Sequence, residues 1–336
     1  MKNVALALAS GGPRGFAYIG AIEVLLERGY RITSIAGTSA GSLVGGIYAA
    51  GGLNAFKEWL YGLDAMKVMS LMDFSVSKNY LVKGERVMNA VRERVPEVNI
   101  EDLPIPFAAV ATDLHTGEEV VFREGPLFEA IRASVSIPSM FRPVRWKGRT
   151  LVDGGMVNTF PLNRVQRTPG DILVGFNVNQ IDAEEIRAYL ESKAAFSQNE
   201  AAIRQEAKTL IQDTLSAERS KILQQMRKAG SRGGKLLRER IDSEVREHRL
   251  DAASRESWIP VDADDNFKTI LQRSFGIMNC TIARMGIALN PPDILIDLPF
   301  DSFHGVYGYS HAKEIVEIGR HLTEEALDRY EKDSSI

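Results

Sequence analysis

The sequence predicts an α/β fold in which a mostly parallel sheet is covered by helices. Three observations support this prediction. Short apolar runs alternate with helical patterns in the N-terminal half, Gly and Pro mark the turns between them, and no apolar run approaches the length of a membrane-spanning helix. The 336 residues are 44% hydrophobic and 25% charged, which is typical of a globular chain that buries a substantial core.

The first four elements form a strand, helix, strand, helix series. Residues 4–9 (VALALA) predict a strand buried on both faces, and residues 16–26 predict a buried helix that ends before Gly29. Residues 32–37 predict a second strand, and residues 40–52 predict a second helix. The small residues of the second helix would let it pack closely against the sheet.

Further strands are predicted wherever a short apolar run lies between Gly and Pro turns. These are residues 105–112, 118–122, 150–155, 171–179 and 293–299. An apolar helical pattern covers residues 267–289, and a final helix is predicted at 311–330.

A charged segment interrupts this pattern. Of the 76 residues from Asp182 to Ser257, 29 are Asp, Glu, Lys or Arg, a higher share than the 25% of the whole chain. Apolar residues at helical spacing within the segment indicate helices. We therefore expect a core formed by residues 1–181 and 263–336, with a charged helical insertion at 182–262.

Charge and cysteine content exclude several classes of protein. The net charge of -3 gives no whole-chain reason to expect nucleic acid. Cys280 is the only cysteine, which excludes an internal disulfide or a cysteine-based metal site and fits a reducing compartment. The N-terminal apolar run is shorter than the roughly 7–15 residues of a signal-peptide core. We expect a cytoplasmic protein that uses no metal or cofactor.

Residues 37–41 (GTSAG) carry the first candidate catalytic residue. A strand, the sequence Gly-x-Ser-x-Gly and a helix form the order of a nucleophile elbow, in which a sharp turn exposes the Ser39 hydroxyl and the small residues Gly37 and Gly41 make room for it. The start of a helix also favours developing negative charge. From this pentapeptide alone, a plain helix N-cap is an equally good interpretation.

Asp153 is the better candidate for the base. None of the five histidines lies in an obvious strand-end loop beside a glycine, which weakens an ordinary Ser-His-Asp triad. Asp153 directly follows an apolar strand and precedes Gly154 and Gly155, where backbone can approach closely. An aspartate can act as base if it reaches the serine hydroxyl. An Asp-Gly turn without catalytic function is the alternative.

The turn after the first strand, SGGPRG at 10–15, is the candidate oxyanion hole. Gly11 and Gly12 can supply N–H donors, and the turn would neighbour Ser39 if the first two strands pair. Pro13 has no N–H but suits the first turn of a helix. An ordinary strand-to-helix turn is the alternative.

Together these motifs resemble the patatin-like phospholipase family. The order SGGPRG, GTSAG and then Asp-Gly-Gly at 153–155 matches the family, and the stretches 111–122, 133–144 and 308–312 support the match. The resemblance covers about residues 1–180 and the last 70 or so.

The resemblance implies a three-layer α/β/α sandwich and hydrolysis of acyl esters of lipids by a Ser-Asp dyad. Ser39 would be the nucleophile and Asp153 the general base, while Gly11 and Gly12 would supply the oxyanion hole together with Arg14. An acyl-enzyme would form without metal or calcium. The chain departs from many members at Ser10, where they carry a third glycine.

The same residues bear on the rival functions. A dinucleotide site is disfavoured because SGGPRG lacks the G-x-G-x-x-G spacing, and a P-loop because no Gly-Lys-Ser or Gly-Lys-Thr follows. A non-catalytic lipid-binding or regulatory protein of the same fold, and an acyltransferase with the same acyl-enzyme, remain alternatives.

The basic segment 219–240 is a candidate membrane contact. It contains eight Lys or Arg and one acidic residue, interspersed with apolar side chains. This pattern predicts peripheral binding to anionic lipid at the inner membrane surface. A solvated helical hairpin or a mobile lid is the alternative.

Overall fold

The computed structural model describes residues 2–73, 80, 82–180, 267–299 and 306–333. The chain divides into two compact units, Met1–Asp182 with Gln272–Ile336, and Ala183–Leu271. The first unit contains the sheet and the candidate site. The predicted helical insertion at 182–262, with the basic segment 219–240, lies outside the described residues and stays a prediction.

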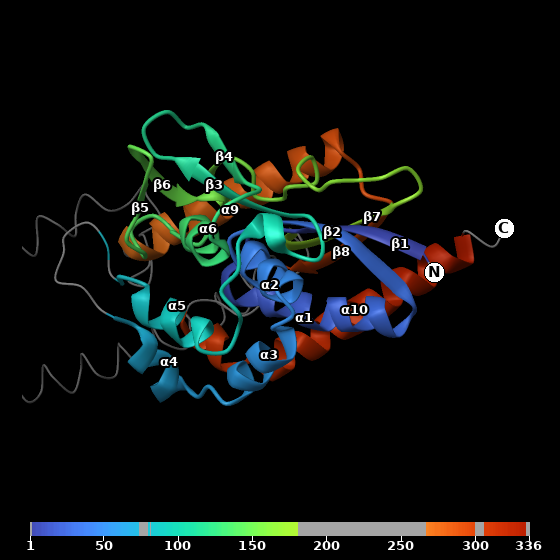
Figure 1. Ribbon diagram of the computed structural model, residues 1–336, viewed down its shortest axis with the longest axis horizontal. Helices are drawn as coiled ribbons and strands as arrows, with labels where there is room; N and C mark the ends of the chain where they lie inside the picture. Colours follow the sequence, from blue (N-terminus) through green and yellow to red (C-terminus); the bar gives the residue numbers. More distant parts are fainter. Residues whose placement is uncertain (1, 74–79, 81, 181–266, 300–305, 334–336) are drawn as a thin grey trace, which may run out of the picture. The chain divides into compact units, whose positions relative to one another are not determined.

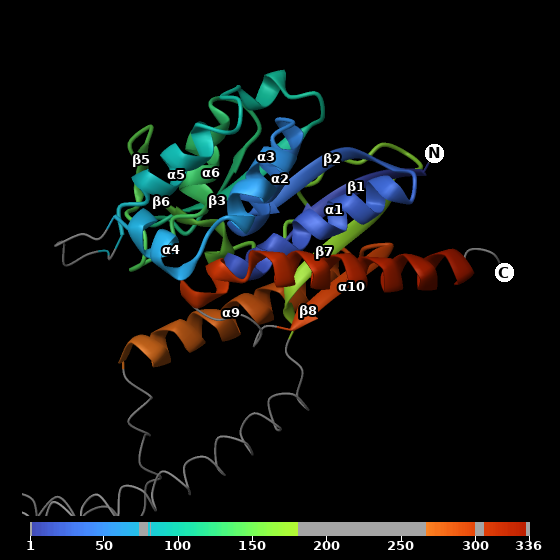
Figure 2. The same ribbon diagram turned by 90° about the horizontal axis from the view of Figure 1, so that it is seen from below.

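The first unit is built on one eight-stranded sheet (Figures 1 and 2). The strand order is β5-β6-β3-β2-β1-β7-β8, with β4 paired to β3. The strands are β1 (Lys2–Leu8), β2 (Tyr30–Thr38), β3 (Phe107–Asp113), β4 (Glu119–Phe122), β5 (Val144–Trp146), β6 (Arg149–Asp153), β7 (Ile172–Gln180) and β8 (Ile294–Pro299). Five strands, β1, β2, β3, β7 and β8, are mutually parallel. β4 and β6 run antiparallel to β3, and β5 runs antiparallel to β6.

This arrangement confirms the predicted α/β class and mostly parallel sheet. Each of the seven strands predicted from apolar runs is present, with ends that differ by a few residues. β5 was not predicted, because a three-residue strand is too short to carry a periodic signal.

β1 lies inside the sheet and is buried on both faces. Val4, Leu6 and Leu8 pack into the larger core on one face. Ala5 and Ala7 pack on the opposite face. Alternate residues of a strand point to opposite faces, so both sets of side chains must be apolar. The second face is covered by residues near Phe160 and by the helix that contains Ala283.

Helices cover both faces of the sheet. They are α1 (Ala17–Glu27), α2 (Ala40–Ala49), α3 (Leu53–Tyr61), α4 (Ala65–Leu71), α5 (Glu85–Arg92), α6 (Leu127–Ser134), α9 (Phe267–Leu289) and α10 (Ala312–Asp333). In Figure 1, α1 and α10 lie on one side of the sheet and α9 on the other, which gives the three layers that the sequence resemblance implied. No helix in the described part of the chain combines the length and apolar character that crossing a membrane requires.

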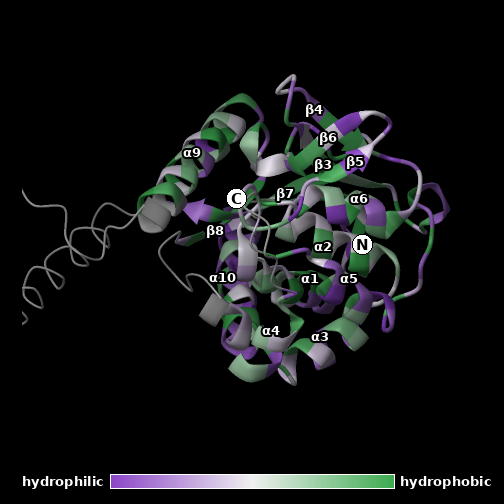
Figure 3. Cartoon of the chain, turned by 90° about the vertical axis from the view of Figure 1, so that its left-hand side faces the viewer, coloured by the Kyte–Doolittle hydropathy of each residue, from purple (hydrophilic) through white to green (hydrophobic). Residues whose placement is uncertain are grey.

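The apolar residues concentrate where the layers meet. In Figure 3 green is frequent in the ribbon around α2, whereas purple is frequent on outer loops and on peripheral helices such as α5 and α10. The small residues of α2 serve the close packing that the sequence predicts. A Cβ on Gly45 would lie 2.7 Å from the Ile35 side chain, so the helix could not approach β2 as it does with a larger residue there.

Candidate active site

Ser39 lies in the sharp turn between β2 and α2. Its φ of 54° is in the left-handed region, which non-glycine residues adopt at a cost, and this is the backbone expected of a nucleophile elbow. A Cβ on Gly37 would lie 2.3 Å from the backbone of Gly41, and a Cβ on Gly41 would lie 2.2 Å from the carbonyl oxygen of Leu8. Both glycines are therefore required for the turn to close against the end of β1.

The Ser39 hydroxyl donates a hydrogen bond to Asp153. Ser39 Oγ and Asp153 Oδ2 are 2.5 Å apart, and both residues are buried. The second carboxylate oxygen of Asp153 accepts a hydrogen bond from the Gly155 N–H at 2.7 Å. At Gly154, a Cβ would lie 2.3 Å from the Val110 carbonyl oxygen, so the chain can leave β6 here only through a glycine. Two residues 114 positions apart in the sequence are thus in direct contact.

Sheet register brings these residues together. Thr38, the last residue of β2, pairs with Val110 of β3, so Ser39 follows at the level of Ala111. On the other side of β3, Asp153 pairs with Ala111. Asp153 therefore reaches the site at the end of an antiparallel strand, not at the carboxyl end of a parallel one as the strand-end rule assumes.

Burial changes the acidity of Asp153. Desolvation of the carboxylate raises its pKa from 3.8 to about 6, although the hydrogen bonds from Ser39 and from the Gly155 N–H lower it. A carboxylate with a pKa near 6 is mostly ionised at neutral pH, yet it is more basic than an exposed aspartate. Both properties suit a general base.

The glycine turn lies at the end of β1, beside the Ser39 turn. Leu8 of β1 pairs with Gly37 of β2, so the two turns follow neighbouring strand ends. No described residue accepts a hydrogen bond from the N–H of Gly11 or Gly12. Gly11 must be glycine, because a Cβ there would lie 2.0 Å from the Val178 side chain. These N–H groups are available to a ligand, as an oxyanion hole requires.

Arg14 follows in a short 3₁₀ turn, Gly12–Phe16, and is buried. Its Nε lies 3.8 Å from the position that a Cβ on Gly11 would occupy, so the guanidinium is close to the glycine turn. Pro13 occupies the first turn of this 3₁₀ helix, where its missing N–H costs little.

The described histidines pair away from the dyad. His115 contacts Thr150, His311 contacts Glu314, and His321 contacts Glu325. In the part of the chain that the structure describes, no group of three or more His, Cys, Asp or Glu side chains is arranged to hold a metal ion.

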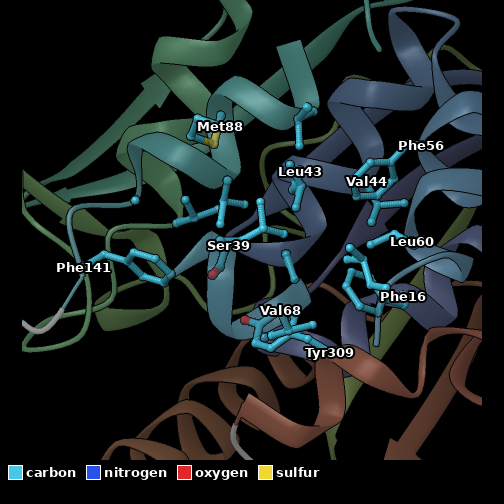
Figure 4. Close-up of a pocket in the computed structure, with 18 of the residues that line it drawn as sticks. Phe16, Ser39, Leu43, Val44, Phe56, Leu60, Val68, Met88, Phe141 and Tyr309 are labelled. Atoms are coloured by element: carbon cyan, nitrogen blue, oxygen red, sulfur yellow. The ribbon is translucent and has the colours of Figure 1, made fainter. Parts of the chain in front are cut away.

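An apolar pocket opens beside Ser39 (Figure 4). It measures about 950 Å³, including the part open to solvent. The wall combines side chains from α2, α3, α4 and α5 with those of neighbouring loops, namely Phe16, Leu43, Val44, Phe56, Trp59, Leu60, Leu63, Val68, Leu71, Met72, Val87, Met88, Val91, Val135, Ile137, Phe141 and Tyr309. Gly12, Ser39 and Ala40 contribute to the same wall. An apolar chain can therefore lie in contact with the serine.

Comparison with known proteins identifies the family of this chain. A family model for patatin-like phospholipases matches residues 6–165. An uncharacterised NTE family protein of Mycobacterium tuberculosis is 35% identical over 341 residues, which cover 98% of this chain and 93% of that protein. The chain belongs to the patatin-like phospholipase family.

Other relatives of this patatin-like protein are longer. A patatin-like phospholipase domain-containing protein of Caenorhabditis elegans is 30% identical over 196 residues, covering 56% of this chain and 14% of that protein. A lysophospholipase of Mycosarcoma maydis is 32% identical over 191 residues, covering 56% of this chain and 10% of that protein.

The structure adds two residues to the patatin-like site that sequence reasoning did not single out. Ser134, at the end of α6, accepts a hydrogen bond from the Ser39 N–H at 2.8 Å and donates one to the Val110 carbonyl at 2.6 Å. It thus fixes the strained turn to β3. Tyr309 reaches the pocket from the segment before α10 (Figure 4). Both lie in stretches that resemble the family, but neither has a local pattern that indicates a role.

Proposed function

We propose that this protein is a lipid acyl hydrolase that cleaves carboxylic esters through Ser39 and Asp153. The observation that carries the proposal is the 2.5 Å hydrogen bond from Ser39 Oγ, which lines an apolar pocket, to the buried carboxylate of Asp153. Membership of the patatin-like phospholipase family, and the name lysophospholipase of the Mycosarcoma maydis relative, support an acyl lipid as substrate.

In the acylation step, Ser39 Oγ attacks the ester carbonyl carbon and its proton moves to Asp153 Oδ2. The carbonyl electrons move to the oxygen, which accepts hydrogen bonds from the N–H groups of Gly11 and Gly12. Collapse of this intermediate breaks the ester bond. The leaving alkoxide takes the proton from Asp153, and the acyl group remains on Ser39.

In the deacylation step, water replaces the alcohol. Asp153 accepts a proton from the water as it attacks the acyl-enzyme, and Ser39 regains a proton when the fatty acid leaves. A single carboxylate thus serves as base and then as acid in each half reaction. The wall of the pocket would hold the acyl chain and keep bulk water from it, which strengthens the hydrogen bonds at the carbonyl.

A substrate panel tests this function. Nitrophenyl esters, lysophospholipids and phospholipids should be hydrolysed by the wild type and not by Ser39→Ala, and a fluorophosphonate probe should label only the wild type. Labelling of neither protein would favour a non-catalytic lipid-binding protein. Retained hydrolysis in Asp153→Asn would refute the base, and transfer of the acyl group to an added alcohol would identify an acyltransferase.

The cytoplasmic location and the membrane contact belong to the same proposal. The location rests on the single cysteine, and the contact rests on the basic segment 219–240. Vesicle co-sedimentation tests the contact. The full chain should bind anionic vesicles more strongly than neutral vesicles, and a chain in which 219–240 is deleted should lose this difference. Equal binding of the full chain and the deletion variant to anionic vesicles would refute the membrane contact.

A further inference from the structure

The space beside Gly12 is open and faces a tyrosine hydroxyl. A Cβ placed on Gly12 would have one neighbour within 4 Å apart from its adjacent residues, the hydroxyl oxygen of Tyr309, at 3.9 Å. Gly12, Ser39 and Tyr309 line the same pocket. The Tyr309 hydroxyl therefore lies close to Gly12, within the pocket that also contains Ser39.

Tyr309 is held in place by its ring and not by its hydroxyl. The ring packs edge-on against Phe16 with centroids 5.8 Å apart and contacts the apolar cluster of Val68, Met72 and Val82. No described residue is hydrogen-bonded to the Tyr309 hydroxyl. Tyr309 is half-buried and lines the pocket, so its hydroxyl is fixed in place where a bound substrate can accept a hydrogen bond from it.

We infer that the Tyr309 hydroxyl donates a hydrogen bond to the substrate carbonyl oxygen as that oxygen becomes an oxyanion, as a third donor beside the N–H groups of Gly11 and Gly12. This inference rests on the proposed function. It also gives the site a donor from outside the glycine turn, in which Pro13 has no N–H to offer.

The electrostatics of the site keep this hydroxyl protonated. Burial and the neighbouring charge of Asp153 raise the pKa of Tyr309 to about 12, while Arg14 lowers it. The phenol therefore remains a donor throughout the pH range in which Asp153 acts as base. During acylation the Ser39 oxygen forms its bond to carbon, the carbonyl electron pair moves to oxygen, and the Tyr309 proton stays on the phenol.

Tyr309→Phe tests the inference, because it removes the hydroxyl and keeps the ring. We expect kcat to fall by about 10²-fold, as for other oxyanion donors, with KM within about twofold of wild type and an unchanged Tm. The rates of hydrolysis of nitrophenyl and alkyl esters should fall by the same factor, since a donor to the oxyanion acts regardless of the leaving group. The rate of fluorophosphonate labelling should fall as well.

Tyr30→Phe is a matched control. It likewise removes one tyrosine hydroxyl and keeps the ring. The Tyr30 hydroxyl is hydrogen-bonded to Glu331 at 2.7 Å, and Tyr30 is the first residue of β2, nine residues before Ser39. Its kcat should equal that of wild type. Ser39→Ala in the same assays tests the proposed function separately. If Ser39→Ala is inactive while Tyr309→Phe is fully active, the inference fails and the function stands.

Other outcomes with Tyr309→Phe would also overturn the inference. A loss confined to alkyl esters would make Tyr309 a donor to the leaving group, and a change in KM alone would make it a wall of the pocket.

Should the variant fail to fold, a fluorinated tyrosine at position 309 keeps the ring and lowers the phenol pKa. The inference then requires activity to be lost at a lower alkaline pH than in wild type, and an unchanged alkaline limb would refute it.

Discussion

Replacing Asp153 by Asn should stabilise the protein while it abolishes activity. The buried carboxylate has a pKa of about 6, against 3.8 for an exposed aspartate, because burial disfavours the charged form. The folded state therefore binds the proton more tightly than the unfolded state. The contribution of the protonated Asp153 carboxyl group to stability is complete below pH 3.8 and is lost as the pH rises through about 6.

The size of the effect follows from the two pKa values. At about 1.36 kcal/mol per pKa unit, the ionised carboxylate destabilises the fold by about 3 kcal/mol at pH 8 and by about half of that at pH 5. Asn is neutral at both pH values. Its carbonyl oxygen can still accept from the Gly155 N–H, and its amide can donate to Ser39 Oγ, so the geometry is retained.

Thermal unfolding at pH 5 and pH 8 measures this difference. We expect the Tm advantage of Asp153→Asn over wild type to be several degrees larger at pH 8, since 1 kcal/mol corresponds to about 2–4 °C in domains of 150–250 residues. Asp171→Asn is the matched control. Asp171 is also buried. Burial raises the pKa of Asp171, but hydrogen bonds from the Thr168 N–H and hydroxyl lower the pKa overall. Asp171→Asn should therefore be less stable than wild type at pH 8. An equal advantage of Asp153→Asn at both pH values, or none at pH 8, would refute the reasoning.

Three further predictions concern activity. Because the base must be ionised, kcat/KM should rise about tenfold per pH unit below an apparent pKa of about 6 and level off above it. A value of kcat/KM that falls with rising pH through this range would contradict the role of Asp153. Leu43→Trp, which fills the pocket one helical turn after Ser39, should abolish hydrolysis of long-chain nitrophenyl esters and spare the acetate, and equal losses on both esters would argue against an acyl pocket. Ser134→Ala leaves the buried Ser39 N–H without its partner, which should destabilise the turn by about 1–3 kcal/mol. We expect kcat to fall about tenfold or more with little change in KM, and wild-type kinetics would show that the turn does not need this bond.

The sequence predicts some parts of the site because they depend on local backbone geometry. At Gly37, Gly41 and Gly154, an added Cβ would lie 2.2 to 2.3 Å from a neighbouring backbone atom, so only glycine fits. In the sequence these positions appear as glycines close to Ser39 or Asp153. The alternation of apolar runs and turns predicts seven of the eight strands. The sequence does not predict helices α3 to α6. Each has only seven to nine residues, and helices of this length are stabilised by packing against the rest of the protein.

The sequence by itself determined the strand and helix order, the strained Ser39 turn and the identity of Asp153 as a candidate, since each depends on residues close together in the chain. Only the tertiary structure decided that Asp153 meets Ser39, that Ser134 holds the turn and that Tyr309 faces Gly12. Contacts between segments 95 to 114 residues apart, such as those of Ser39 with Ser134 and Asp153, depend on how strands pair across β3. Pairing between strands that are distant in the chain is decided only when the whole sheet packs, so the residues around Ser39 do not show which carboxylate will meet it.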